Sequence, residues 1–179
     1  MRRGTPAGRV SAPRDPALWE GFLERVFAHA RLRTLLEGEW RPRDLVAFHA
    51  RHKMQLLAHD PELYRAAGRM VAAAGVRPRE RVAAEYAEVF RRALAAEVTV
   101  GKNVNALQHC LGMLRLEPSP RDDVLRAIDA YAAGRVSLRE ATALLRRHAA
   151  GESRRYVRDQ TFLSPFPYGL LDDVAFDRR

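Results

Sequence analysis

Apolar residues recur three and four positions apart along most of the chain, a spacing that places them on one face of an α-helix. Gly, Pro and capping residues separate these stretches. The pattern predicts helices over these segments: Leu18–Glu37, Arg43–Ala58, Pro61–Gly75, Pro78–Val98, Lys102–Leu116, Pro120–Ala133, Leu138–Ala149 and a short one over Arg154–Phe162. No stretch alternates with a period of two, so we expect no strands.

These segments predict an all-α protein, a single irregular bundle of about seven helices. Residues 1–16 are rich in Pro, Gly and Arg, and we expect them to form a flexible basic tail. Residues 17–171 would form the helical domain and residues 172–179 a C-terminal tail. Pro165 and Pro167 cannot lie inside a helix, so the end of the chain is expected to be an extended arm.

The first predicted helix has an apolar stripe that we expect to face the core. Its members are Leu18, Trp19, Phe22, Leu23, Val26 and Ala30. Two later helices begin with capping signals. Asp60-Pro61-Glu62 offers a side-chain cap, a proline at the first position and an acidic first turn. Ser137 and Glu140 have the spacing of a capping box.

Three polar residues interrupt the apolar stripe of the second helix. His49, His52 and Lys53 share the helical face that also carries Leu45 and Leu56. A buried polar group is unfavourable unless it has a hydrogen-bond partner. The pattern therefore leaves two interpretations, which are polar groups paired inside the core and a helix face that lines a binding site.

The fifth predicted helix is divided into an apolar and a polar side. Val104, Leu107, Leu111 and Leu114 lie on one side, and Asn105, Gln108, His109 and Gly112 lie on the other. The polar side has no Arg, Asp or Glu, and its Asn, Gln and His can each form several hydrogen bonds. It would suit a ligand or the edge of a nucleic-acid base, or a buried network that joins neighbouring helices.

The charge of the chain favours an anionic partner. The formal net charge is +9, and Lys53 and Lys102 are the only lysines among 31 basic residues. Arginine binds phosphate through a planar fork and stacks on bases, so a basic domain of this kind suggests nucleic acid. A G+C-rich genome would also favour arginine over lysine, but it would not explain the positive sign.

Catalytic and metal chemistry have weaker support. Cys110 is the only cysteine, which excludes an intramolecular disulfide and a site built from several cysteines. We expect its thiol to be inert. His49, His52, His59 and His109 could share a metal only if the fold assembled them, and Lys53 would repel the ion. We therefore expect no metal, no cofactor and no catalytic residue. No signal peptide or membrane span is evident, so a cytoplasmic location is expected.

Four blocks together resemble the YbgA-type domain, a domain of unknown function. They are FHARHKMQLLAHDPELYRAAGRMVA, NVNALQHCLGMLR, YAAGRVSLREATALLRRH and YVRDQTFLSPFP, in the family's order, and the resemblance extends from Leu45 to Leu171. The chain departs from the family at Asn103, Met113–Arg115, Ser137 and Arg147-His148. Family members are often fused to an iron–sulfur thiouracil desulfidase, and there this domain is thought to bind tRNA. The resemblance implies an RNA-binding module whose desulfidase partner could act in trans.

The combined expectation is a free-standing RNA-binding domain, with tRNA as its target. The residues expected to line the RNA or ligand cleft are His49, His52, Lys53, Lys102, Asn105, Gln108 and His109. Arg65, Arg69, Arg147 and His148 are expected to contact phosphates, with Lys102. One alternative is a small enzyme, or an enzyme subunit, acting on a nucleotide or modified base through a histidine-lined cleft. Another is a protein-docking module that does not bind RNA.

Overall fold

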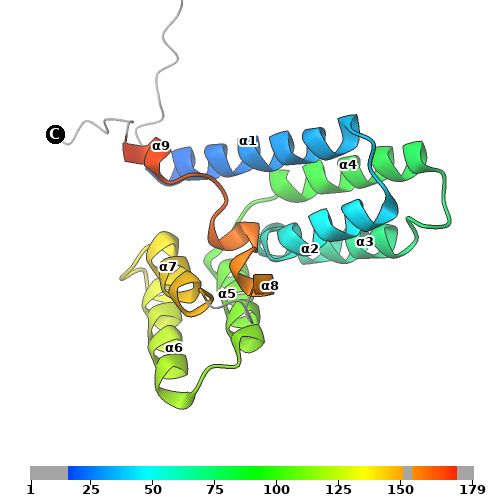
Figure 1. Ribbon diagram of the computed structural model, residues 1–179. Helices are drawn as coiled ribbons and strands as arrows, with labels where there is room; N and C mark the ends of the chain where they lie inside the picture. The colour runs from blue at the N-terminus through cyan, green and yellow to red at the C-terminus, as the bar shows by residue number, and fades with distance from the viewer. Residues whose placement is uncertain (1–15, 151–154, 173–179) are drawn as a thin grey trace, which may run out of the picture.

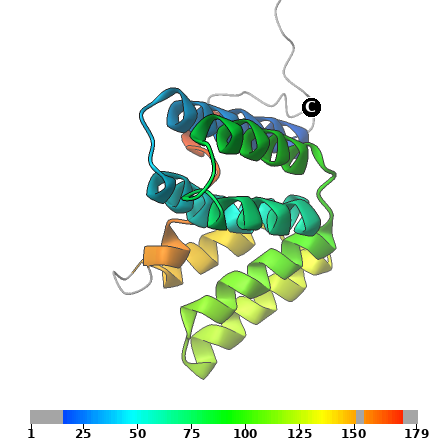
Figure 2. The same ribbon diagram turned by 90° about the vertical axis from the view of Figure 1, so that its right-hand side faces the viewer.

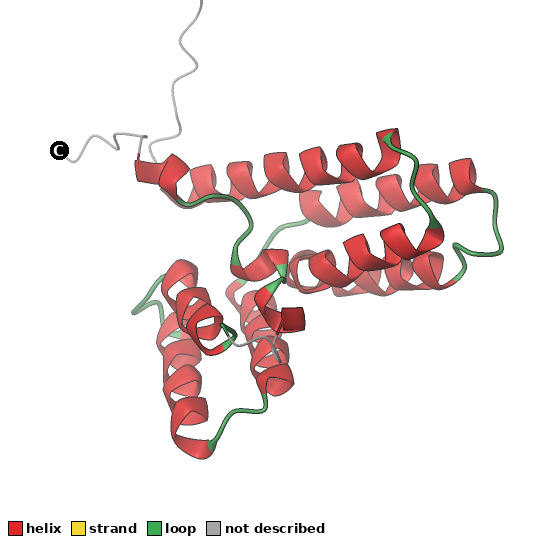
Figure 3. Ribbon diagram, in the orientation of Figure 1, coloured by secondary structure: helices red, strands yellow, loops and turns green. Residues whose placement is uncertain are grey.

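The described part of the protein is built from helices. The computed structural model describes residues 16–150 and 155–172. Its helices are α1 Pro16–Glu37, α2 Pro42–His59, α3 Pro61–Ala72, α4 Arg79–Ala95, α5 Val100–Leu114, α6 Pro118–Ala132, α7 Leu138–His148, α8 Arg155–Arg158 and α9 Gly169–Asp172, with a 3₁₀ turn at Thr161–Leu163. No strand occurs within the described ranges (Figure 3). The predicted all-α class is confirmed, whereas the N-terminal tail and the last seven residues lie outside the described ranges.

The helix starts follow the capping signals. The Asp60 carboxylate accepts hydrogen bonds from the backbone N–H groups of Glu62 and Leu63, each at 2.9 Å. Ser137 and Glu140 form the expected reciprocal box, since each side chain accepts from the other's backbone N–H. Prolines occupy the first position of α2, α3 and α6, where a helix has no use for an N–H donor.

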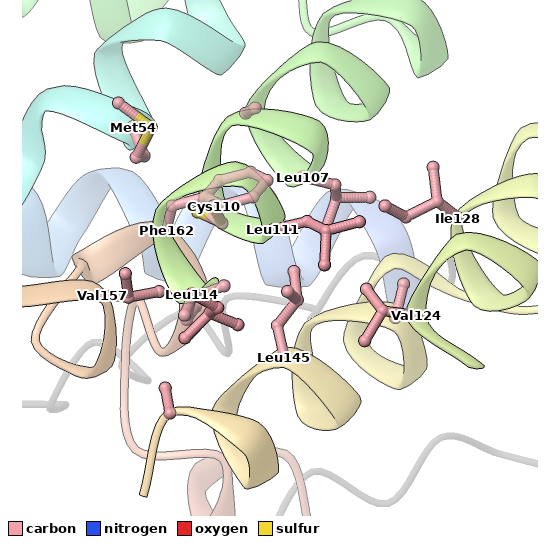
Figure 4. Packing of buried hydrophobic residues seen from close by; sticks show 14 of the residues in the cluster. Met54, Leu107, Cys110, Leu111, Leu114, Val124, Ile128, Leu145, Val157 and Phe162 are labelled. Atoms are coloured by element: carbon pink, nitrogen blue, oxygen red, sulfur yellow. The ribbon is translucent and has the colours of Figure 1, made fainter. Parts of the chain in front are cut away.

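The helices form two connected groups. α1 and α4 lie side by side above α2 and α3, and α5, α6 and α7 form a second group below them (Figures 1 and 2). One apolar core fills the space between α1, α2, α3 and α4, and includes Leu45, Leu56, Tyr86 and Phe90. The other lies between α2 and the later helices, where Leu107 and Leu111 of α5 face Ile128 and Leu145 (Figure 4).

Helix α2 contributes to both cores. Leu45 and Leu56 belong to the first, and Met54 and Leu57 to the second. Every side chain from Met54 to His59 is buried. α2 is thus covered on opposite sides, which explains why its sequence lacks a single clear polar face.

The segment after α8 returns to α2. The Gln160 side-chain amide donates a hydrogen bond to the Ala50 carbonyl at 2.8 Å, and the Thr161 hydroxyl donates to the Arg51 carbonyl at 3.1 Å. The segment 164–168 is not helical, as its prolines predict, but the described chain ends in a helical turn instead of continuing as an extended arm. Pro167 precedes a helical turn rather than interrupting one, and α9 follows it beside the start of α1 (Figure 1).

The apolar stripe expected on α1 is also wrong in part. Leu23 is buried, but Leu18, Phe22 and Val26 are 62%, 45% and 43% exposed. Apolar residues occur on more than one side of this helix, and the buried side is completed instead by Ala28 and Leu32. None of the helices in the described ranges has the length and apolar character needed to cross a bilayer.

Candidate nucleic-acid interface

The outer side of α5 presents hydrogen-bonding groups to solvent. Thr99 caps the helix by accepting from the Lys102 N–H, and the predicted division of its sides is confirmed. Leu107, Leu111 and Leu114 are buried, whereas Asn105, Gln108 and His109 are exposed. Within the described residues, none of these three polar side chains has a hydrogen-bond partner.

This exposure excludes the alternative of a buried amide–imidazole network on that side. Gly112 lies on the same exposed side, and a Cβ built there would meet no atom within 4 Å. Packing inside the described protein therefore does not require a glycine at this position. A glycine in the interior of a helix destabilises it by about 1 kcal/mol relative to alanine.

The histidines of α2 have a different setting. His49 Nδ1 lies 3.1 Å from the Tyr86 hydroxyl, and its ring stacks on Tyr64 with 6.3 Å between centroids. Burial, reinforced by the charge of Lys53, lowers the pKa of His49 to about 4. The ring is therefore neutral at pH 7 and is held among α2, α3 and α4.

His52 lies deeper in the protein. Only 2% of its surface is exposed, and its ring stacks on Phe48 with 4.0 Å between centroids. His52 Nδ1 lies 2.8 Å from the Phe48 carbonyl, an acceptor, so this nitrogen carries the proton. Burial lowers the pKa of His52 to about 3, so the neutral ring presents Nε2 as an acceptor.

The structure does not bring the α2 histidines and the α5 polar side into one cleft. α2 and α5 contact each other through apolar side chains, with Met54 and Leu57 meeting residues such as Leu107. The polar groups of each helix consequently lie away from this contact. The expectation of a shared cleft was wrong because a helical wheel defines a face but not the helix that covers it.

Both lysines have local partners. Lys53 Nζ lies 5.1 Å from the centroid of the Tyr156 ring, a cation–π distance. Lys102 Nζ donates to the Glu97 carbonyl at 2.6 Å, near the end of α4. Neither ammonium group is therefore as available to a phosphate as the sequence alone suggested.

Several arginines are available. Arg65 and Arg69 on α3 and Arg147 on α7 are exposed, and none forms an ion pair within the described ranges. By contrast, Arg77 and Arg81 both bind Glu85, at 2.8 and 2.9 Å. His148 is half-buried at the end of α7. The three unpaired arginines can therefore form charge-assisted bonds with phosphate oxygens.

The described residues contain no group of three or more His, Cys, Asp or Glu side chains placed to hold a metal ion. Cys110 is fully buried, and burial raises the pKa of its thiol to about 12. That thiol is inert in the folded protein.

Two residues that the sequence pattern did not indicate, Arg31 and Arg51, lie near His52. Both line a pocket between α1 and α2 together with His52. Arg51 directly precedes His52 in the chain, which only weakly indicates that the two residues share a site. Nothing in the sequence indicates that Arg31 belongs to this site, because only the crossing of α1 over α2 places it there.

The family model that describes a protein of unknown function, DUF1722, matches residues 53–167. This is the family of the YbgA-type domain. The chain belongs to the DUF1722 family. Neither a curated protein nor a solved structure matches it. The DUF1722 match includes the whole of α5 with Asn105, Gln108 and His109, but it begins after His52. The pocket between α1 and α2 thus lies outside the matched residues.

Proposed function

We propose that this DUF1722 protein is a cytoplasmic RNA-binding module whose target is a tRNA. The observation that carries the proposal is the exposed side of α5, where Asn105, Gln108 and His109 have no partner within the described residues. Amide and imidazole groups of this kind bond to base edges and sugar hydroxyls. Each of these side chains has more than one hydrogen-bonding position, so they are suited to holding a nucleotide.

The arginines supply the electrostatic part of the proposal. Arg65, Arg69 and Arg147 are exposed and free of ion pairs among the described residues, and the formal net charge is +9. Phosphate contacts position an RNA without reading its sequence. The α5 side chains would then hold bases or riboses that unpaired regions of a tRNA leave accessible.

A desulfidase acting in trans on thiolated bases of the same tRNA is the partner that the YbgA-type resemblance suggests. In that arrangement the present chain supplies RNA affinity and the partner supplies the chemistry. Mixing the two purified proteins with a thiolated tRNA tests this point, because the module should lower the KM of the desulfidase for tRNA without changing its rate on a free thionucleoside.

Fluorescence anisotropy of a labelled tRNA at several salt concentrations tests RNA binding itself. We expect the logarithm of the association constant to fall linearly with the logarithm of salt concentration, by about 0.7 to 0.9 for each phosphate contact. Arg65→Gln and Arg69→Gln should each reduce that slope. Arg81→Gln, which removes the same charge from an arginine bound to Glu85, is the matched control.

Variants of the exposed α5 side chains test whether this helix contacts the RNA. Asn105→Ala and Gln108→Ala combined should weaken binding by about tenfold or more with an unchanged salt slope, because the hydrogen bonds of the two amides are uncharged. His109→Ala should weaken binding further. Absence of binding to any tRNA at low salt would refute the function. Binding that is unaffected by the α5 changes would refute this interface.

A further inference from the structure

A pocket between α1 and α2 has the chemistry of a small-molecule site. Its volume is about 490 Å³, within the range of about 300 to 1,000 Å³ for ligand pockets. Phe27, Leu35, Ala47 and Phe48 supply apolar surface, and Arg31, Arg51 and His52 supply polar atoms. This combination of an apolar wall with a few polar groups is typical of sites that bind one defined ligand.

Arg31 is a positive charge that has no counter-ion among the described residues. It is half-buried, its Nη1 is covered, and that nitrogen has no hydrogen-bond partner among the described residues. Burial and the nearby charge of Arg51 lower the pKa of Arg31. Its guanidinium carbon lies 5.7 Å from the centroid of the Phe27 ring, so its close neighbour is a ring rather than a carboxylate. An uncompensated charge in this setting is unfavourable.

Asp44 also lines the pocket but is engaged elsewhere. Its carboxylate accepts from the Arg41 backbone N–H at 2.7 Å and lies 3.8 Å from Nε of Arg43. Arg51 is exposed and forms no ion pair within the described ranges. The pocket thus contains two guanidinium groups and one carboxylate, and that carboxylate is bonded at the start of α2. The guanidinium groups can therefore pair with an added anion.

His52 contributes an unpaired acceptor. Its Nδ1–H donates to the Phe48 carbonyl, so the lone pair of the neutral ring is on Nε2. Nε2 is buried and has no partner among the described residues, and it is not bonded to the equally unpaired Arg31. A buried polar atom left without a hydrogen bond is rare in folded proteins. Two such atoms in the walls of one pocket indicate that a bound ligand supplies their hydrogen bonds.

The occupant must match three features of the pocket. It needs an anionic group for the guanidinium groups of Arg31 and Arg51, an O–H or N–H donor for Nε2 of His52, and a flat apolar body for the Phe27 and Phe48 walls. A nucleotide has all three, in its phosphate, its hydroxyl or amino groups, and its base.

We propose that the pocket between α1 and α2 binds a nucleotide, with the phosphate held by Arg31 and Arg51 and a hydroxyl or amino group donating to His52 Nε2. Contact with the two buried nitrogens requires the Arg31 side chain to rotate when the nucleotide binds. The nucleotide is either free in solution or a single unstacked residue of an RNA, and both present the same groups. This site is separate from the α5 side chains and does not depend on them.

Calorimetric titration of the full chain with each of the four nucleoside monophosphates tests the proposal. We expect at least one to bind, the matching nucleoside and inorganic phosphate to bind much more weakly, and Arg31→Met to reduce affinity about tenfold or more. Arg33→Gln on the same helix is the control, since Arg33 is exposed, pairs with Glu37 and does not line the pocket.

Arg31→Met has a second readout that a purely structural arginine would not give. Removing an uncompensated charge should raise the melting temperature while binding is lost. A lower melting temperature together with unchanged affinity would overturn the proposal. It would also be overturned if none of the four monophosphates bound at about 10 mM and RNA did not bind at about 0.1 mM.

Competition distinguishes the two sources of the nucleotide. If a monophosphate displaces tRNA, and Arg31→Met weakens both ligands, the pocket takes a nucleotide of the RNA. If the monophosphate binds while tRNA affinity is unchanged in Arg31→Met, the ligand is a free nucleotide. The second result supports the pocket even where RNA binding through α5 fails, so the two proposals can fail separately.

Discussion

The side chain of Gln160 is bonded to the middle of α2 through Ala50, 110 residues earlier in the chain. Its amide donates to the Ala50 carbonyl at 2.8 Å, and its oxygen lies 3.4 Å from the Met54 N–H. These two backbone groups are four residues apart, the spacing of a helical hydrogen bond. α2 is continuous from Pro42 to His59, so Gln160 adds side-chain contacts to groups of its hydrogen-bond ladder, while its own residue is 2% exposed.

Gln160→Ala should destabilise the protein by about 2 to 3 kcal/mol, because it removes the hydrogen bonds of a buried side chain and creates a cavity. Urea unfolding measures the change. Gln108→Ala is the matched control, since that glutamine is exposed and should change the free energy of unfolding by less than about 0.5 kcal/mol. Equal effects of the two substitutions would contradict the role assigned to Gln160.

The free energy of unfolding should fall as the pH drops below about 6.5. The pKa of His49 is lowered to about 4 and that of His52 to about 3, so the folded protein holds both rings neutral. The unfolded chain protonates them first and therefore binds more protons over this window. Each histidine contributes a slope of at most about 1.4 kcal/mol per pH unit, down to pH about 4 for His49 and about 3 for His52.

Urea titrations at pH 7.5 and pH 5 would measure this slope. His49→Gln and His52→Gln should each flatten it, whatever their effect on stability at neutral pH. An unchanged slope in the double variant would show that other groups account for the acid sensitivity.

The Glu24 carboxylate should affect the free energy of unfolding at acidic pH. Its carboxylate lies 3.3 Å from Nε2 of His59 and accepts from Gln55 Nε2 at 2.8 Å. Burial opposes ionisation, but these hydrogen bonds outweigh it and lower the pKa of Glu24 below its usual 4.5. This stabilisation is fully present above the pKa that Glu24 has in the unfolded chain. It is lost as the pH falls through the lower pKa that Glu24 has in the folded protein.

Glu24→Gln should cost about 2 kcal/mol at pH 7, since Gln55 and His59 lose a charged acceptor. Glu37→Gln, the same change at the exposed end of the same helix, should cost less than about 0.5 kcal/mol. Thermal melts of the two variants compare them directly, and similar losses would exclude a buried network at Glu24.

Gly112→Ala should raise stability and lower RNA affinity together. The position is exposed and has space for a methyl group, so the helix gains up to about 1 kcal/mol. If RNA approaches α5 closely, the added Cβ weakens binding. A stabilised variant with unchanged tRNA affinity would show that Gly112 lies outside the interface.

The sequence predicted most of what depends on local spacing. The caps at Asp60 and Ser137 and the two sides of α5 are local properties of their segments, and all were found. The exposed Phe22 and the pocket at Arg31 depend on which helix covers which face. That choice is made by long-range packing, and a single sequence with several apolar sides on α1 does not determine it.

The place of α2 in both cores determines how the molecule can be divided. The family match begins at residue 53, in the middle of this helix, so the limit of sequence similarity is not a limit of autonomous folding. A fragment of residues 53–167 lacks Leu45 of α2 and also the covering that α1 gives to α4, and should aggregate. The full chain, by contrast, should melt in one calorimetric transition, because neither core can lose α2 without the other. Two resolved transitions would contradict this mutual dependence.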